Sequence, residues 1–312
     1  MSSVLIRLHS LGDVVLAEPA ARYLAGMGTV HFMVRERYEA VVGRMASGVL
    51  PVPVADSTGP MGLRRMVREI RPDRIIDLQG NLTTYLATWP GKASHWSQNR
   101  TLRRRILRGS GESLPYRSEE FLRTAGGEGQ AFPHLEAAPI EPGGEMTVGL
   151  VAGGRWPAKS LPPGVLSELG RILSDRLDCG LVVIGESSDA EEADSVAESL
   201  FDRKVTVVAG RDDVAGLLQR IESLDLLVSP DSGPAHLAYA LGVPVVVVFT
   251  STSPALGFWR SDYPGAYMAP GVECRPCHKH GGRVCREGSF RCKSELLPFM
   301  IAEKALDILE RS

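Results

Sequence analysis

A single acidic residue follows the first apolar segment of the chain, in the stretch RLHSLGDVVL at residues 7–16. Gly12 has no Cβ, so another molecule can approach the backbone there, and the helix expected after it directs free N–H groups into the same space. The commonest role of an acid at such a corner is to cap the helix, which stabilises it by about 1 kcal/mol. The other role is that of a general base for a reacting hydroxyl. The corner alone leaves both roles open for Asp13.

A more specific corner lies in the second half, in LLVSPDSGPAHLAYALGVPVVVVF at residues 226–249. A buried strand is expected to end there and a helix to begin with a proline, whose missing N–H costs nothing at a first helical position. The free amides of Ser232 and Gly233 can donate to phosphate oxygens, and Asp231 can accept from a ribose or sugar hydroxyl. His236, one turn further, is either a ligand contact or an ordinary histidine on a helix face. The segment predicts an anion-binding cradle.

Four of the five cysteines crowd into one polar, glycine-rich loop with the spacing C-x2-C-x7-C-x6-C. Four thiolates so close together can satisfy a tetrahedral metal ion, zinc ahead of iron, and such a metal would order the loop. Free thiols are the alternative, since cytosolic cysteines stay reduced. Cys179 stands apart and is expected to be a small buried apolar residue. The candidate ligands of this structural site are Cys274, Cys277, Cys285 and Cys292.

The elements that must position these residues alternate between short β-branched runs and longer amphipathic stretches, which favours an α/β fold with parallel sheets covered on both faces. The predicted strands are 4–8, 30–34, 74–78, 147–151, 181–184, 205–208, 226–229 and 243–249. The predicted helices are 14–25, 61–70, 164–176, 190–200, 214–223 and 234–241. Ligands of open α/β sheets lie beyond the carboxyl ends of the strands, so function is expected at strand-to-helix corners.

Length and charge narrow the class of protein. The 312 residues are enough for two domains, and 44% apolar with 23% charged residues is an ordinary globular composition. A formal net charge of −2 gives no global basic field for nucleic acid, so no nucleic-acid partner is expected. No secretory leader and no apolar run of about 20 residues is found, which predicts a cytoplasmic protein.

A Gly- and Pro-rich segment at residues 124–145 separates the two series of strands and helices, as a linker would. We therefore predict an N-terminal Rossmann-like domain at 1–145 and a C-terminal one at 146–312, whose last helix is free to pack back on the first domain. Two such sheets facing each other would form a cleft for ligands.

Three segments in this order resemble glycosyltransferase family 9, the ADP-heptose:lipopolysaccharide heptosyltransferases. They are IRLHSLGDVVLAEPA, DLQGN at residues 77–81, and DSGPAHLAYALGVPVVVVF. The glycine-aspartate corner is weak evidence alone, but its combination with the DSGPxH segment and the LGVP continuation is specific. The resemblance runs from residue 4 to the final LLPFMIAEKALDIL helix.

The resemblance implies a GT-B fold with the acceptor in the first domain and the nucleotide sugar in the second. It also implies inverting transfer of heptose from ADP-heptose to a lipopolysaccharide-core acceptor without a catalytic metal, and the chain has no Asp-x-Asp motif. In the family a lysine after the glycine-rich turn neutralises the diphosphate, which assigns this role to Lys159, with Arg155 as the competing candidate. Asp13 matches the family's proposed general base.

Further site residues follow from the same resemblance. Gly12 and Gly153 are expected at the donor, and Glu186 near the adenosine, although Asp189 or Glu191 also fits. Asp77, Gln79 and Asn81 end a first-domain strand, where they either line the acceptor side or satisfy a turn.

An arginine-rich run at residues 95–109 is the remaining motif. A charge run is usually a solvated face, but an anionic lipid-linked acceptor or an anionic inner-membrane surface would be attracted to it. Arg103 and Arg104 are the candidate acceptor contacts.

Other functions stay open from the sequence. A GT-B transferase with another nucleotide sugar or a protein acceptor is the nearest alternative, and a non-catalytic nucleotide-sugar-binding module is another, because fold alone does not establish activity. Pro230 and His9 depart from the family pattern, so the sugar and the acceptor position are undetermined, as is the oligomeric state.

Overall fold

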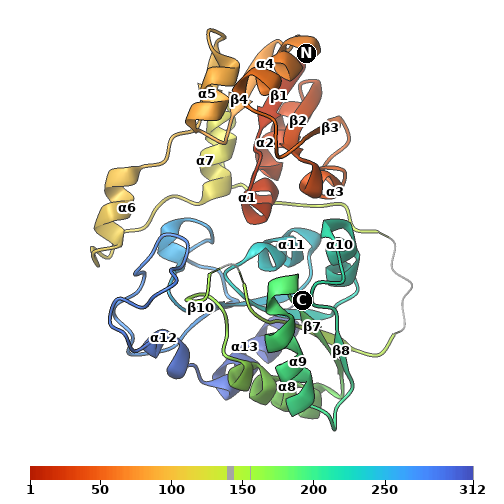
Figure 1. The fold of residues 1–312 in the computed structure, drawn as a ribbon, viewed down its shortest axis with the longest axis vertical. Helices are drawn as coiled ribbons and strands as arrows, with labels where there is room; N and C mark the ends of the chain where they lie inside the picture. The colour runs from red at the N-terminus through yellow and green to blue at the C-terminus, as the bar shows by residue number, and fades with distance from the viewer. Residues whose placement is uncertain (139–143, 155, 312) are drawn as a thin grey trace. The chain divides into compact units, whose positions relative to one another are not determined.

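The structure is a computed structural model that describes residues 1–138, 144–154 and 156–311 (Figure 1). The chain forms two compact units. The first contains Met1–Asn99 and Pro115–Ala137, and the second contains Arg100–Leu114 and Ala138–Ser312. The chain therefore passes from one unit to the other three times, and the arginine-rich run belongs to the second unit.

The first unit is built on a five-stranded parallel sheet of order β3-β2-β1-β4-β5. Its strands are β1 (Ser2–Ile6), β2 (Thr29–Arg35), β3 (Val49–Val54), β4 (Arg74–Asp77) and β5 (Ala93–His95). Its helices are α1 (Leu11–Leu16), α2 (Glu18–Ala25), α3 (Glu39–Val42), α4 (Pro60–Ile70), α5 (Leu82–Thr88) and α7 (Arg117–Thr124). Apolar residues of α4 and α5 pack on one face of the sheet in a single core cluster, while α2 packs against α7 and β2.

The second unit contains a six-stranded parallel sheet of order β11-β10-β9-β6-β7-β8. Its strands are β6 (Thr147–Val151), β7 (Gly180–Ile184), β8 (Val205–Val207), β9 (Leu226–Pro230), β10 (Val245–Phe249) and β11 (Ala266–Met268). Its helices are α6 (Arg100–Ile106), α8 (Pro163–Leu177), α9 (Ala190–Ser199), α10 (Val214–Glu222), α11 (Gly233–Leu241), α12 (Arg291–Ser294) and α13 (Pro298–Leu309).

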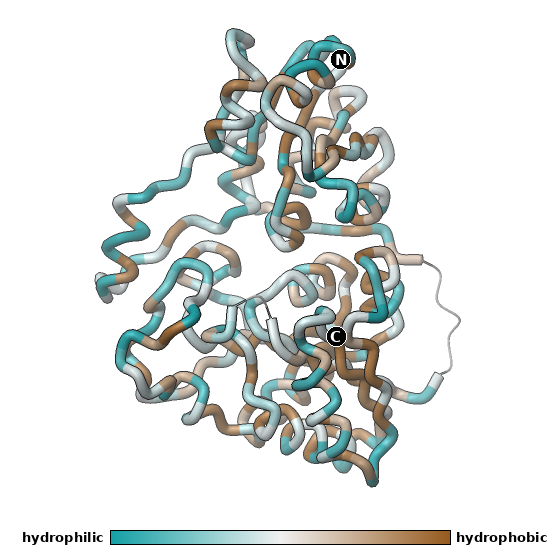
Figure 2. The backbone as a smooth tube through the Cα atoms, viewed as in Figure 1, coloured by the Kyte–Doolittle hydropathy of each residue, from teal (hydrophilic) through white to brown (hydrophobic). Residues whose placement is uncertain are grey.

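Helices cover both faces of the second sheet, as its buried strands require. Figure 1 shows α10 and α11 on one side of the strands and α8, α9 and α13 on the other. Figure 2 shows the hydrophobic residues concentrated along the strands, such as β7, all of whose residues are buried. The α/β class with two parallel sheets is thus confirmed. The last helix, α13, packs against α8 and β10 of its own unit.

The prediction of one continuous helix over residues 14–25 is wrong. Residues 14–25 form two helices, because the chain breaks at Ala17 and α2 restarts with Pro19 in its first turn. Proline has no N–H to donate to the preceding turn, so a continuous helix would lose a hydrogen bond there. The sequence also gave no prediction for β3, whose two prolines are tolerated because β3 is an edge strand.

Each sheet reverses its strand order at its first strand, because β1 lies between β2 and β4, and β6 lies between β7 and β9. Such a switch point opens a crevice beyond the carboxyl ends of the strands. The corners after β1 and β4 therefore meet in the first unit, and those after β6 and β9 meet in the second.

Among the described residues, no helix combines the length and apolarity needed to span a bilayer.

Candidate functional site

In the first unit, Asp13 lies at the switch-point corner after β1, in the first turn of α1. The N-cap position of this helix is Ser10, and the Ser10 hydroxyl donates to Asp13 Oδ2 at 3.0 Å. Gly12 lies in the same turn. The Asp13 side chain keeps 10% of its surface exposed, so it is held by the protein yet reachable from one side.

Two arginines hold the Asp13 carboxylate. Arg7 Nη2 lies 2.6 Å from Oδ2, and Arg117 Nη1 of α7 lies 3.6 Å from Oδ1. Both guanidiniums are more buried than the acid, with 7% and 3% of their side chains exposed. Arg117 stacks over the Trp96 ring at 4.4 Å, and Arg7 donates to the Leu78 carbonyl oxygen at 2.7 Å. The cations therefore stabilise the negative charge of Asp13 and fix its position.

The residues after β4 organise this corner. The Gln79 Oε1 accepts from the backbone amides of Leu8 at 3.1 Å and His9 at 3.4 Å, which ties the loop after β4 to the loop that leads to Asp13. Asp77 is completely buried and accepts from the amides of Gln79 and Gly80, at 2.9 and 3.0 Å. Its other oxygen accepts from the Thr84 hydroxyl at 2.7 Å and lies 3.0 Å from His95 Nδ1.

The Asn81 side chain caps α5, where it accepts from the Thr84 amide at 3.0 Å in a capping box. Asp77, Gln79 and Asn81 are thus brought together, and the bonds that they make here serve the turn and the corner. Asn81 is exposed and Gln79 half-buried, so part of each stays accessible beside the Asp13 corner.

In the second unit, the switch-point corners after β6 and β9 are joined by an ion pair. Lys159 Nζ lies 2.7 Å from Asp231 Oδ2 and donates to the Asp231 carbonyl oxygen, also at 2.7 Å. The lysine is the more exposed partner, with 17% of its side chain accessible against 5% for the aspartate. The sequence placed both residues at the donor but did not predict that they form a pair.

Asp231 is held on every side. Its Oδ2 accepts from the Thr252 hydroxyl at 2.9 Å, and its Oδ1 accepts from Trp259 Nε1 at 3.0 Å. Burial alone would raise the pKa of Asp231, but the nearby cations and these bonds together lower it below its ordinary value. Asp231 is therefore ionised and holds Lys159 in place. Both of its carboxylate oxygens already have partners, which leaves little room for a hydrogen bond from a sugar hydroxyl.

His236 is buried in α11 and stacks on Trp259, with 4.6 Å between ring centroids and 15° between planes. Trp259 and Thr252 were missed by the sequence analysis, because a tryptophan and a threonine in a loop carry no pattern of their own. Only their position beside Asp231 assigns them to the site.

The amides of the predicted cradle occupy the start of α11, where Ser232 is the N-cap and Gly233 the first helical residue. The Ser232 hydroxyl lies 3.0 Å from that of Ser229. The first N–H groups of a helix have no partner within the helix and favour an anion. Phosphate oxygens therefore fit at this end, next to Lys159.

The glycine-rich turn after β6 is fixed by Asp189. A Cβ on Gly153, whose φ is +72°, would lie 2.2 Å from the Asp189 carboxylate, so only glycine fits there. Asp189 is buried and accepts from the amides of Gly154 and Glu186, at 3.2 and 2.9 Å. Asp189 is committed to the turn, whereas Glu186 and Glu191, the other two candidates for the adenosine contact, are both exposed. Arg155, the competing phosphate cation, lies outside the described residues.

The arginines of α6 form an exposed run on the second unit, where the helix is anchored by Ile106 in a small cluster with Leu114 and Leu256. Burial and the charges of Arg100 and Arg104 lower the pKa of Arg103. Arg104 is exposed. The run stays cationic and accessible, as an anionic partner would require.

The cysteine-rich loop packs directly against the turn that carries Lys159. The Ala158 amide donates to the Gly282 carbonyl oxygen at 3.0 Å, and a Cβ on Gly281 would lie 2.8 Å from the Lys159 side chain. One pocket of about 220 Å³ is lined by Cys274, Cys277 and Cys285 together with Arg286 and Glu287, while Cys292 is buried in α12.

The thiols of this loop differ in acidity. Burial raises the pKa of Cys292 to about 11, whereas backbone amides led by that of Phe290 lower the pKa of Cys285. In the described part of the chain, no three Cys, His, Asp or Glu side chains are arranged to hold a metal ion. Cys179 is buried and the pKa of its thiol is raised by burial to about 11, as expected for an inert residue.

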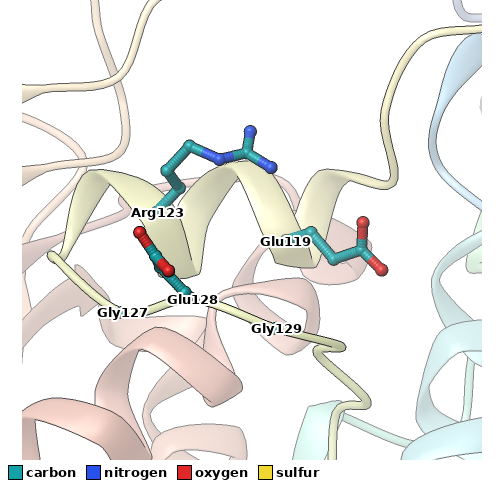
Figure 3. Close-up of a pocket in the computed structure, with 5 residues that line it drawn as sticks. All are labelled: Glu119, Arg123, Gly127, Glu128 and Gly129. Atoms are coloured by element: carbon teal, nitrogen blue, oxygen red, sulfur yellow. The ribbon is translucent and has the colours of Figure 1, made fainter.

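A separate polar pocket of about 260 Å³ lies at the end of α7 (Figure 3). Glu119 and Arg123 reach out from the helix and Glu128 from the following loop, with two glycines beside them. None of the predicted site residues lines this pocket, so we assign it no part in the site.

Two parallel α/β sheets, each covered by helices, are the architecture of the GT-B class, which includes glycosyltransferases that use sugar nucleotides. The family is defined by sequence as well. Residues 127–285 match the family model described as glycosyltransferase family 9 (heptosyltransferase), and the chain belongs to this family.

Individual relatives agree with this assignment. The chain is 24% identical to lipopolysaccharide heptosyltransferase 1 of Pseudomonas aeruginosa, over 89% of this chain and 86% of the relative. Its fold is similar to that of ADP-heptose lps heptosyltransferase II of E. coli, with a TM-score of 0.74 at 18% identity over 100% of this chain and 99% of the other. It is also similar to the iron-containing dodecameric glycosyltransferase TibC of enterotoxigenic E. coli, with a TM-score of 0.64 at 10% identity over 99% and 76%.

Proposed function

We propose that this glycosyltransferase moves a heptose from ADP-heptose to a lipid-linked saccharide of the lipopolysaccharide core, with inversion at the anomeric carbon and without a catalytic metal. One observation carries the proposal: each unit presents one ionic group at its switch point, a carboxylate held by arginines in the first and a lysine held by an aspartate in the second. An acid and a cation are the two groups that metal-free transfer from a nucleoside diphosphate needs.

Asp13 is the proposed general base. The acceptor hydroxyl attacks the anomeric carbon from the face opposite the diphosphate, and its proton passes to the Asp13 carboxylate as the new C–O bond forms. The bond from the anomeric carbon to the phosphate oxygen breaks with its electron pair, and ADP leaves. A single carboxylate suffices for inversion, whereas retention by double displacement needs a second one as nucleophile.

Lys159 is the proposed partner of the leaving diphosphate. Negative charge grows on the phosphate as the glycosidic bond breaks, so a fixed ammonium and the amides of Ser232 and Gly233 stabilise the transition state more than the ground state. Asp231 acts through Lys159 by holding it in place, and Glu186 is the proposed contact of the adenosine.

The first unit is the proposed acceptor side. Gln79 and Asn81 lie in the loop tied to the Asp13 corner, where their accessible amides can bind saccharide hydroxyls, and Asp77 shapes that loop.

The second unit is proposed to contribute positive charge. Arg103 and Arg104 on α6 of that unit would attract an anionic acceptor. Such an acceptor would place the enzyme at the cytoplasmic face of the inner membrane.

The four cysteines of the loop at residues 274–292 are proposed to hold a structural zinc or iron ion. Their donor chemistry fits either metal, three of them share one pocket, and the TibC neighbour is described as iron-containing. Because no set of three ligands is assembled in the described residues, metal binding requires the loop to rearrange. Metal analysis of protein purified without a histidine tag tests this: a fully folded chain without metal would refute it.

The transfer itself is tested with purified enzyme, ADP-heptose and a lipopolysaccharide-core acceptor with and without chelator. We expect ADP release, a product of inverted anomeric configuration by NMR and no effect of the chelator on the initial rate. A thermal-shift screen of ADP-, GDP- and UDP-sugars identifies the donor. Stabilisation by ADP-heptose without transfer to any acceptor would instead identify a binding module.

A further inference from the structure

Helix α5 exposes an apolar stripe that no residue of the predicted site uses. Leu82, Tyr85, Leu86 and Trp89 follow one another at helical spacing and are 73%, 45%, 45% and 58% exposed. The opposite side of the helix is buried against the sheet of the first unit through Ala87. Three large apolar side chains of this seven-residue helix, and Trp89 at its C-cap, therefore face solvent, an arrangement that typically marks an interaction site.

Helix α4 lies beside α5 and carries exposed apolar and positively charged residues of its own. It packs beside α5 on the same face of the sheet, and both helices bury apolar residues in the same core cluster (Figure 1). Met61 on α4 is 86% exposed, and Arg65 and Arg68 are exposed on the same helix. Lys92 follows α5 and is exposed as well. We define the α4–α5 face as Met61, Arg65, Arg68, Leu82, Tyr85, Leu86, Trp89 and Lys92.

Positive charge predominates in this region. Glu69 contacts Arg65 at 3.3 Å, but the chain has no acidic residue between Asp77 and Glu112. Apolar and aromatic residues bordered by arginine and lysine match the interface of a bilayer, because Trp and Tyr favour the headgroup level and the cations attract anionic lipids.

We infer that the α4–α5 face docks on an anionic phospholipid surface. A second copy of the chain is the less favourable occupant, because a symmetric dimer would bring the same arginines and lysine of both copies together. The inference deepens the proposed function, since a lipid-linked acceptor is reached at such a surface. It requires neither donor nor acceptor, so binding and transfer can be measured independently.

The test is sedimentation of the full chain with phosphatidylcholine vesicles that contain or lack phosphatidylglycerol. The parent protein is expected to bind the anionic vesicles, and increasing salt to weaken that binding. The double variant Leu86→Glu with Trp89→Glu is expected to lose binding at least tenfold. Replacing Arg68 and Lys92 by Gln removes an attraction of about 1 kcal/mol each, which corresponds to a loss of about 30-fold in binding in total.

Matched controls lie in the second unit. Phe201→Glu changes an apolar side chain that is 88% exposed, and Arg211→Gln removes an exposed cation; both are expected to bind vesicles as the parent does. Circular dichroism and thermal unfolding establish whether each variant folds. If the Glu variant fails to fold, the Gln variant still tests the inference.

Three results would overturn the inference. The parent binds anionic and neutral vesicles equally weakly, or both α4–α5 variants bind as the parent does, or the parent is a dimer that Trp89→Glu converts to a monomer. In the last case the face is an interface between copies. Loss of vesicle binding with unchanged transfer to a water-soluble core saccharide would support the lipid assignment and leave the proposed reaction intact.

Discussion

The Asp13 corner of the first unit and the Lys159 corner of the second each hold an ion pair, but the more exposed partner is the acid at the first corner and the cation at the second. At Asp13 the two cations are the buried partners, with 7% and 3% of their side chains exposed, and the acid is the accessible one at 10%. At Lys159 the acid is buried, with 5% exposed, and the cation is accessible at 17%.

The difference indicates which partner acts and which one holds. A buried charge is stable only when an opposite charge and hydrogen bonds satisfy it, so the deeper partner is committed to the protein. The more accessible partner is the one that a substrate can reach. By this argument we propose Asp13 as the acting group in the first unit and Lys159 in the second, with Arg7, Arg117 and Asp231 as positioning residues.

The largest expected effect is that of Asp13→Asn. The amide keeps the shape of the carboxylate but cannot take the proton of the acceptor hydroxyl, so we expect kcat to fall by about 10²–10⁴-fold. Donor affinity, measured by calorimetry with ADP-heptose, is expected to stay within about twofold, because the donor is assigned to the other unit.

This variant leaves the buried Arg7 without its anion, which costs stability of about 3–5 kcal/mol, while Arg117 keeps Glu120 at 3.2 Å. The assay is therefore run well below the unfolding temperature, with near-ultraviolet circular dichroism as the check of the fold. Transfer at the parent rate by folded Asp13→Asn would exclude Asp13 as the base and reverse the assignment of roles at this corner.

The next effect is that of Lys159→Met, which tests the cation of the second corner. Loss of one fixed donor to a developing phosphate charge lowers kcat/KM for the donor by about 10²-fold, and the KM of the acceptor is expected not to change. Lys304→Met on α13 is the matched control and should match the parent in both constants. Weaker acceptor binding with normal donor binding in Lys159→Met would contradict the assignment of Lys159 to the donor.

A smaller effect is expected for Trp259→Phe, which removes one hydrogen bond to Asp231 and leaves Lys159 in place. Hydrogen bonds to charged groups are worth about 1.5–3 kcal/mol, and since this one acts only through Asp231, we expect about a tenfold weaker donor affinity. Fluorescence or calorimetric titration with ADP measures it. If donor affinity is unchanged while the free energy of unfolding falls, Trp259 only stabilises the fold.

What could be predicted from the sequence was local. The Asp13 corner and the DSG turn each follow a strand within a few residues, so period and turn chemistry were enough to find them, whereas Lys159 was assigned only through the resemblance to the family. The parallel sheets followed from the alternation of strands and helices. The break between α1 and α2 was missed although Pro19 marks it, because the apolar period continues across Ala17.

What could not be predicted depends on contacts between distant segments. Arg117 reaches Asp13 from a helix late in the first unit, and Trp259 reaches Asp231 from a loop after β10. Single arginines and tryptophans have many structural uses, so neither pattern pointed to the site. Asp77 illustrates the opposite problem: an acid after a strand is equally consistent with a ligand site and with the turn that it binds here.

Glu18, another buried carboxylate that is paired with an arginine, sharpens the comparison. It lies in the first turn of α2 with only 1% of its side chain exposed, but its cation, Arg22, is 48% exposed. Burial raises the pKa of Glu18 from an ordinary 4.5 to about 7, despite the Arg22 Nε at 3.0 Å and a hydrogen bond from the His134 amide. Asp231, whose cation is itself largely buried, has a lowered pKa instead. A cation that solvent screens therefore does not keep a buried acid ionised.

The last prediction follows from that contrast and concerns stability, with no effect expected on activity. The pKa of Glu18 is higher in the folded chain than in the unfolded one, so its favourable contribution is complete below pH 4.5 and is lost as the pH rises through about 7. Glu18→Gln cannot ionise and keeps an acceptor for the His134 amide. We expect its free energy of unfolding by urea to match the parent near pH 4.5 and to exceed it by up to about 3 kcal/mol at pH 8. Glu198→Gln, at an exposed position of α9, should show no such pH-dependent difference. A stability difference for Glu18→Gln that is constant across this range would mean that Arg22 keeps Glu18 charged, and partial exposure of the cation would no longer separate this acid from Asp231.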